Sequence, residues 1–208
     1  MPALYPEYWQ QFFTATILEW KTLLQEDKYK KEIIKSLQFL VQQKRIRLYA
    51  FVIMNNHIHL IWQPLPGQTL QTIQHSFLKH TAQEIKPHLQ QTNINLLEQF
   101  KVNAKDRTYQ FWERNSLSVE LRSSKVFNQK LEYIHNNPIK AGLCINAEDY
   151  SYSSAKFYAT GIDAFGMLTQ RRLNSGESAS NSIFLPGYYG PVSVPLIFCC
   201  GQVFCCHR

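Results

Sequence analysis

Hydrophobic and polar positions along the chain change repeatedly between the spacing of strands and the spacing of helices. Residues 11–19 are rich in β-branched and aromatic side chains and predict a strand. Residues 28–43 place apolar side chains on one face at helical spacing and predict a helix. Residues 47–54 are apolar on both faces, which is typical of a strand buried in the middle of a sheet.

A hairpin and a second helix are predicted next. Asn55-Asn56 predict a tight turn because asparagine tolerates positive φ, so residues 57–63 return as the partner strand. Residues 69–86 again show helical spacing, and Pro87 is expected to stop that helix.

One more strand and one more helix complete the pattern. Residues 109–112 predict a short strand, and Ser123 or Ser124 can cap a helix that ends at about Asn136, because Pro138 disfavours helical geometry just before it. The order strand, helix, strand, strand, helix, strand, helix predicts an α+β fold, in which helices pack on an antiparallel sheet.

The character of the chain changes past about residue 168. We therefore expect a domain at 1–168 and a C-terminal extension at 169–208, where helical periodicity is weak and SGESASNS has the composition of a linker. Adjacent cysteines near the end, Cys199-Cys200 and Cys205-Cys206, do not have the C-x₂-C spacing of common zinc sites. The extension is therefore expected to be partly disordered or packed on the domain.

Charge and hydropathy narrow the classes of function. The 208 residues carry a formal net charge of +7, which is consistent with a polyanionic partner. The N-terminus does not resemble a signal peptide, and the chain contains no apolar run of the ~18 residues that a membrane span needs. These features predict a soluble cytoplasmic protein without membrane partners, whose fold does not depend on disulfides.

The segment MNNHIHLIW (54–62) places two histidines in an apolar run. Residues two apart on a strand point to the same face, so His57 and His59 project side by side with Ile61. Two neighbouring imidazoles suit a divalent metal, which then needs a third ligand. The alternative is that both histidines make ordinary surface or core contacts.

The segment LEYIHNNPIKAG (131–142) contains a second candidate constellation. Tyr133 and Asn137 are four residues apart and share one helix face, away from the apolar stripe that includes Ile134. An amide oxygen on that face could supply the third metal ligand, with the phenol within reach of whatever the metal polarises. The alternative is an ordinary helical tyrosine followed by an Asn-Pro helix stop.

Taken together, VIMNNHIHLIW and YIHNNPIKAGL resemble the two signature motifs of the HUH single-tyrosine transposases. The match is closest to the REP-associated tyrosine transposase branch of the insertion-sequence transposase-like family. FWERNSLSVELRS (111–123) and YSYSSAKFYATG (150–161) also match, so the resemblance covers roughly residues 9–168. It implies the ferredoxin-like or RRM-like fold of the HUH domain.

The resemblance also implies a metal-dependent reaction on single-stranded DNA. It assigns His57, His59 and Asn137 as metal ligands, with Mg²⁺ or Mn²⁺ as the cofactor, and Tyr133 as the nucleophile. The phenol would attack a backbone phosphorus, release a 3′-hydroxyl and leave a 5′-phosphotyrosine bond, which a free 3′-hydroxyl can later reverse. The DNA would be nicked and rejoined without ATP.

The resemblance further implies DNA hairpins or imperfect palindromes as partners and a nucleoid location. The helix that carries Lys79 often contacts DNA in this family, and further basic residues are expected to surround the approach to the tyrosine helix. The candidates for phosphate contacts there are Arg107, Arg114, Arg122 and Lys125. Both a monomer acting in cis and a homodimer that exchanges tyrosine helices fit the resemblance.

Two other functions stay open at this point. The first is a protein of the same fold that binds DNA hairpins without cutting them. The second is a hydrolytic nuclease or phosphoesterase that uses His57 and His59 as acid and base without a metal. Enzymes of that second kind usually need two separated histidine motifs, whereas this chain has one H-x-H.

Overall fold

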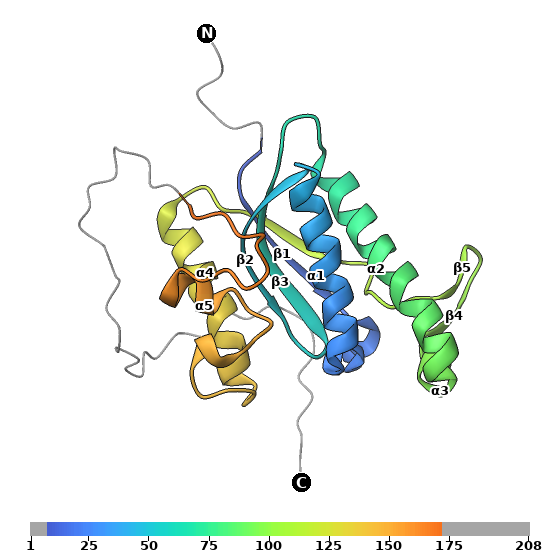
Figure 1. Cartoon of the computed structure of the whole chain (residues 1–208). Coiled ribbons are helices and arrows are strands. Elements are labelled where there is room, and N and C mark those ends of the chain that lie inside the picture. Colours follow the sequence, from blue (N-terminus) through green and yellow to red (C-terminus); the bar gives the residue numbers. More distant parts are fainter. Residues whose placement is uncertain (1–7, 172–208) are drawn as a thin grey trace. The chain divides into compact units, whose positions relative to one another are not determined.

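The computed structural model describes residues 8–171 of the chain (Figure 1). Its centre is a four-stranded antiparallel sheet in the order β2-β3-β1-β6. The strands of that sheet are β1 (Gln11–Thr16), β2 (Ile46–Ile53), β3 (His57–Pro64) and β6 (Leu117–Glu120). The α-helices are α1 (Asp27–Gln42), α2 (Leu70–Thr92), α3 (Ile94–Glu98), α4 (Ser124–Lys140) and α5 (Ala155–Thr160), and β4 (Lys101–Ala104) and β5 (Arg107–Tyr109) form a small hairpin. Short 3-10 turns lie at Leu18–Trp20, Leu23–Gln25 and Ala147–Asp149. The predicted α+β fold is confirmed.

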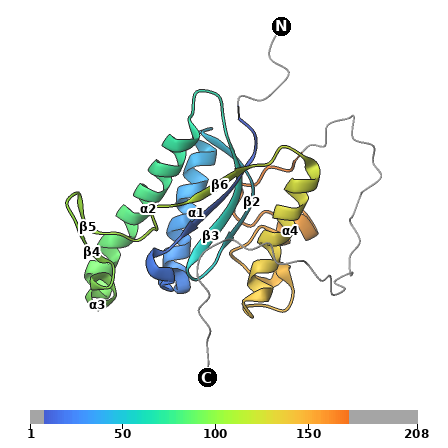
Figure 2. The same cartoon turned by 180° about the vertical axis from the view of Figure 1, so that it is seen from behind.

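Helices cover both faces of the sheet. α1 and α2 lie on one face and α4 on the other, as Figures 1 and 2 show. Alternate residues of β3 face opposite sides of the sheet. Leu60 and Trp62 pack in the core under α1 and α2, whereas Ile61 packs with Ile134 of α4. The alternation predicted for the histidine strand is therefore correct, and it directs both histidines toward α4.

The tight turn between β2 and β3 forms as predicted, but for a different reason. Neither Asn55 nor Asn56 has positive φ. Their carbonyl oxygens instead accept hydrogen bonds from the backbone N–H groups of Leu24 (2.9 Å) and Ile17 (2.8 Å). The turn is therefore fixed by the segment that follows β1, which brings that segment beside the first residue of β3.

Two predicted helix ends are wrong because each helix continues through its proline. α2 runs through Pro87 to Thr92, and α4 runs through Pro138 to Lys140. A proline removes only one backbone donor from a helix, and the residues around it are buried here: Leu89 follows Pro87, and Pro138 is itself buried. Tertiary packing therefore outweighs the local penalty.

The middle of the chain also departs from prediction. The expected strand at 109–112 is split, because Tyr109 ends β5 whereas Trp112 makes an isolated bridge with Ile17, the residue that follows β1. The Trp112 indole donates to Thr81 Oγ1 at 3.0 Å, which anchors the segment to α2. The edge strand β6 carries no clear strand pattern and was not predicted.

The segment after α4 protects the other sheet edge. The backbone N–H of Ser154 donates to Phe51 O at 2.9 Å, and that of Thr169 donates to Leu48 O at 2.8 Å, so both pair with β2. Within residues 8–171 no helix is long and apolar enough to cross a membrane. Most of the predicted extension, with its cysteine-rich end, lies outside the described residues.

Candidate active site

The two histidines stand at the start of β3 on the face covered by α4. Their ring centroids are 4.8 Å apart with the planes steeply inclined. His59 is 4% exposed and stacks on Phe12 of β1 at 5.3 Å, while His57 lies nearer the end of the sheet and is partly buried. The pairing of β1 with β3 places Thr14 opposite His59. The sheet register therefore creates the surroundings of the pair.

Each histidine uses its Nδ1 atom in a hydrogen bond. His59 Nδ1 lies 2.7 Å from Thr14 Oγ1, and His57 Nδ1 lies 2.7 Å from Asn56 Oδ1. The Nε2 atom of His59 is buried and has no hydrogen-bond partner. A buried polar atom without a partner is costly, and metal-bound histidines commonly hold the ring in place through the other nitrogen. The free Nε2 and the held Nδ1 of His59 are therefore compatible with a role as a metal ligand.

Burial keeps both imidazoles neutral. It lowers the pKa of His59 to about 3, and repulsion from His57, when that ring is protonated, and from Lys130 acts in the same direction. Burial also lowers the pKa of His57, and a side-chain hydrogen bond with Asn137 partly opposes that effect. Neutral imidazoles can bind a metal, whereas an acid–base pair would need one of them protonated. The metal-free hydrolytic alternative is therefore disfavoured.

Acid is expected to destabilise the metal-free protein because of these histidines. Burial also lowers the pKa of His135, to about 4. Where a folded-state pKa lies below the ordinary value of ~6.5, the unfolded chain binds more protons, so stability rises with pH. The contribution is fully present above pH ~6.5 and is lost as the pH falls toward the folded-state values. Urea unfolding in EDTA on both sides of pH ~6.5 measures it.

A matched variant measures how much one histidine contributes to the pH dependence of stability. His135 Nε2 lies 2.9 Å from Ser154 Oγ, away from the histidine pair of β3. His135→Gln keeps a polar side chain but cannot titrate, so its free energy of unfolding should depend less steeply on pH. An unchanged slope would contradict the assigned cause.

Tyr133 faces the histidine pair from α4. Ser123 caps this helix by accepting a hydrogen bond from Val126 N at 3.3 Å, and its buried residues, including Ile134, fix which face meets the sheet. The Tyr133 ring is 5.2 Å from that of His59, and the residue is 41% exposed. The phenol is thus next to the histidines yet open to a ligand from solvent.

Asn137 lies next to Tyr133 and His57. Its Nδ2 donates to the carbonyl oxygen of Tyr133 at 2.8 Å, one helical turn earlier. Its side chain also forms the hydrogen bond with His57 that raises the pKa of that imidazole against burial. One chain therefore brings together all four residues of the predicted site, which are His57, His59, Tyr133 and Asn137.

Two lysines beside the phenol were not identified in the sequence. Lys130 Nζ lies 5.7 Å from the centroid of the Tyr133 ring and 4.6 Å from that of Phe12. Lys140 Nζ lies 5.8 Å from the Tyr133 ring on the other side along the helix. Their spacing of three and seven residues from Tyr133 puts all three on one helix face, so helical periodicity could have revealed them.

The donor set fits a hard or borderline divalent cation. In the described part of the chain, no group of three or more His, Cys, Asp or Glu side chains could hold a metal. The available set is therefore two imidazole nitrogens and the amide oxygen of Asn137, which leaves positions for phosphate and water oxygens. The buried, unpaired Nε2 of His59 supports this reading of the site.

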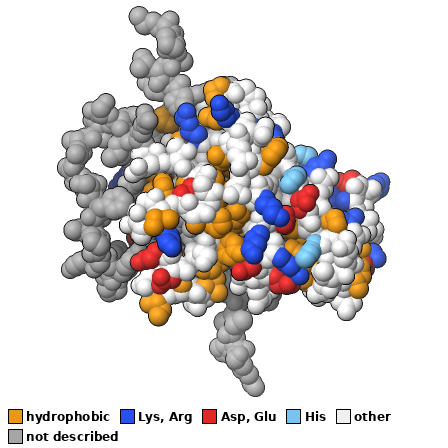
Figure 3. Space-filling model, viewed as in Figure 1, with side chains coloured by type: hydrophobic (Ala, Val, Ile, Leu, Met, Phe, Trp, Pro, Cys, Tyr) orange, Lys and Arg blue, Asp and Glu red, His pale blue; other side chains and the backbone are white. Residues whose placement is uncertain are grey.

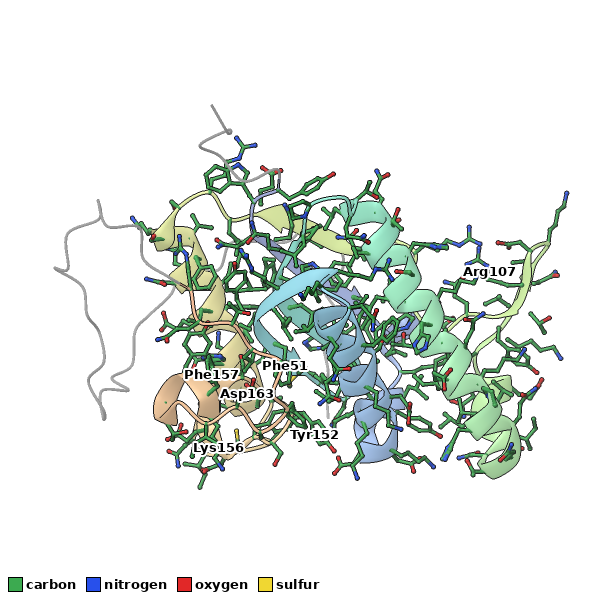
Figure 4. All side chains as sticks on the ribbon, turned by 45° about the horizontal axis from the view of Figure 1, so that its top comes forward. Phe51, Arg107, Tyr152, Lys156, Phe157 and Asp163 are labelled. Carbon is green, nitrogen blue, oxygen red and sulfur yellow. The ribbon has the colours of Figure 1, made fainter. Side chains whose placement is uncertain are left out.

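Lys79 and Arg107 do not approach the tyrosine helix. Lys79 lies on α2, in the layer on the opposite face of the sheet from α4. Arg107 lies in the β4–β5 hairpin beyond α2, as Figure 4 shows, where it pairs with Asp106. Basic and acidic side chains are interspersed over the face that carries α1 and α2 (Figure 3). The expectation that basic residues surround the tyrosine helix therefore fails for Arg107.

The other three predicted DNA contacts lie closer in sequence to α4. Arg114 is in the loop before β6, and Arg122 precedes α4 with its guanidinium 2.7 Å from Glu120. Lys125 is in the first turn of α4, whereas Tyr133 is two turns further on. Their contacts with DNA stay predictions.

The fold matches that of a solved tyrosine transposase. Among solved structures, the chain is similar to a REP-associated tyrosine transposase bound to a REP hairpin, with a TM-score of 0.56 and 17% identity over 83% of this chain and 95% of that one. A putative transposase from Deinococcus radiodurans R1 aligns with a TM-score of 0.44 and 15% identity over 65% and 95% of the two chains. No curated protein matches.

The family assignment comes from the sequence itself. The model of the family described as transposase IS200-like matches residues 13–137, which include both candidate motifs up to Asn137. The chain therefore belongs to the IS200-like transposase family.

Proposed function

We propose that this transposase family member nicks and rejoins single-stranded DNA beside hairpins through a 5′-phosphotyrosine intermediate. The observation that carries the proposal is the position of the exposed Tyr133 phenol next to the buried, unpaired Nε2 of His59 in the same chain. The fold similarity to a transposase bound to a REP hairpin supports hairpin DNA as the substrate class.

The chemical step exchanges one phosphate ester for another. Tyr133 Oη attacks a backbone phosphorus and its proton passes to solvent. The bond from phosphorus to the 3′-oxygen of the upstream nucleotide breaks, and that oxygen takes up a proton as a 3′-hydroxyl. The ester is retained on the tyrosine, so a 3′-hydroxyl can reverse the step. Lys130 and Lys140 place positive charge where the phenolate forms.

A cation fits this reaction because the phenol alone is a weak nucleophile at neutral pH. Mg²⁺ or Mn²⁺ held by His57, His59 and Asn137 would make the phosphorus more electrophilic and stabilise developing charge. Thr14 and Asn56 hold the two rings through their Nδ1 atoms.

The proposed site needs only one chain. α4 places Tyr133 beside the histidines of its own β3, so the reaction proceeds in cis and exchange of helices within a homodimer is not required. This cis arrangement is part of the proposal.

Formation of a covalent adduct tests the proposed function. A hairpin oligonucleotide with unpaired flanks, labelled 3′ of the cut, is incubated with the protein and Mn²⁺ and run on a denaturing gel. We expect a labelled protein band with Mn²⁺ and none with EDTA. Hairpin binding without an adduct would support the non-catalytic alternative and overturn the proposed function.

A further inference from the structure

An exposed tryptophan stands beside the histidine pair. Trp20 lies in the short turn Leu18–Trp20 that follows β1, and it is 62% exposed. Its ring meets that of His57 edge-on, with centroids 5.9 Å apart. The other tryptophans, all within the described residues, are buried or half-buried. Most of the Trp20 ring therefore has no packing function in the domain.

The backbone at this position favours a smaller residue. Glu19 and Trp20 have φ values of 54° and 57°, in the left-handed region where a bulky side chain is unusual and glycine is unstrained. Neighbours hold the turn: Trp20 N donates to Ile17 O at 2.9 Å, and Asn56 Nδ2 donates to Trp20 O at 3.3 Å. Strain that the surroundings maintain at an exposed position points to a function for the side chain.

The tryptophan also borders a hollow of about 660 Å³. Gln25 and Gln99 line this hollow, and each side-chain amide has both donors and an acceptor. Lys21 lies at its border and pairs with Glu19 at 2.6 Å. An aromatic surface next to amides suits a nucleobase, which has a flat face and a polar edge.

We propose that Trp20 is a stacking platform for an unpaired base next to the scissile phosphate. This inference rests on the proposed function, because it requires a DNA phosphate at His57 and His59. A strand held there passes the Trp20 ring, which lies against His57. Stacking on an aromatic side chain is tolerant of base identity, and the base edge would enter the hollow lined by Gln25 and Gln99.

The test measures DNA binding in a protein that cannot cut. In a Tyr133→Phe background, Trp20→Gly removes the ring and Trp20→Phe keeps an aromatic surface. The matched control is Phe39→Ala, which removes another exposed ring, 52% exposed, near the far end of α1. Fluorescence anisotropy with a hairpin that carries unpaired flanks gives the dissociation constants.

Trp20→Gly is expected to weaken binding roughly 5- to 150-fold, the range for loss of one base–aromatic stack. Trp20→Phe should keep most of the affinity, and Phe39→Ala should keep all of it. Because φ of 57° suits glycine, Trp20→Gly should melt no lower than its parent, so weaker binding would not reflect unfolding. Equal affinity of Trp20→Gly and its parent would overturn the stacking platform.

Abasic substitutions locate the stacked base. An abasic site at one flanking position should weaken DNA binding by the parent protein. The same abasic site should not weaken binding by Trp20→Gly any further, because both changes remove the same contact. Additive losses at every position would overturn the inference. If wild type forms the covalent adduct but Trp20→Gly binds DNA as tightly as its parent, only the stacking inference is refuted. If the protein binds DNA but wild type forms no adduct, only the proposed function is refuted. Absence of any DNA binding refutes both.

Discussion

Replacing Tyr133 by phenylalanine is expected to abolish strand cleavage while leaving hairpin binding intact. The substitution removes only the hydroxyl oxygen that becomes bonded to phosphorus, so no covalent intermediate can form. Loss of a catalytic nucleophile costs on the order of 10⁴-fold or more in rate. The fold should be unaffected, because the phenol is 41% exposed and the buried face of α4 is formed by other residues. Denaturing gels measure the adduct, and anisotropy measures binding.

The matched control removes a different phenolic hydroxyl. Tyr109 lies in β5, and its hydroxyl donates to Glu98 at 2.6 Å on the far side of the sheet from α4. Tyr109→Phe should cut DNA at the wild-type rate. An adduct that survives in Tyr133→Phe would show that another residue is the nucleophile, and loss of cleavage in both variants would indicate a general effect of removing a hydroxyl.

The sequence predicts the layers of this fold better than the ends of its elements. β1, α1, β2 and β3 form where their hydrophobic patterns predict them, because their apolar side chains are buried in the two cores on either side of the sheet. Both proline stops fail, since a local preference against helix is small beside the packing of buried residues such as Leu89. β6 is missed because its residues are mostly exposed at an edge, where burial imposes no alternation.

For the candidate site too, the sequence predicts some features and not others. The side-by-side histidines follow from the period of a strand, and the shared face of Tyr133 and Asn137 follows from the period of a helix. That the two pairs meet depends on how α4 crosses the sheet, which periodicity does not determine. Thr14 could not be found at all, because its contact with His59 depends on the register between β1 and β3.

Trp20 shows a further limit of sequence patterns. It directly follows the strand that is predicted at residues 11–19, and its residue type alone does not show which way its ring points. The structure turns it outward through two successive residues with positive φ, a conformation that neither Glu19 nor Trp20 suggests by its type. A candidate DNA contact therefore emerges only once the backbone is known.

His59 is the residue at which stability and function should oppose each other. In the metal-free protein its Nε2 is buried without a partner, which costs about 1–3 kcal/mol. A double variant, His59→Leu with Thr14→Val, removes this atom and also the hydroxyl that bonds to Nδ1. We expect the variant without metal to be more stable than wild type, with a melting temperature higher by roughly 2–10 °C. Cleavage should be lost.

The change in stability on adding Mn²⁺ then shows whether His59 is a metal ligand or only a buried histidine. Wild type should gain about 2.7 kcal/mol at a Mn²⁺ concentration about 100 times its dissociation constant, whereas the double variant should gain nothing. His80→Gln controls for weak metal binding elsewhere, because His80 and Glu84 lie 3.9 Å apart on exposed turns of α2. That variant should keep the wild-type response to Mn²⁺. Equal stabilisation of the double variant and wild type by Mn²⁺ would place the cation away from His59, and the orphaned Nε2 would then need another explanation.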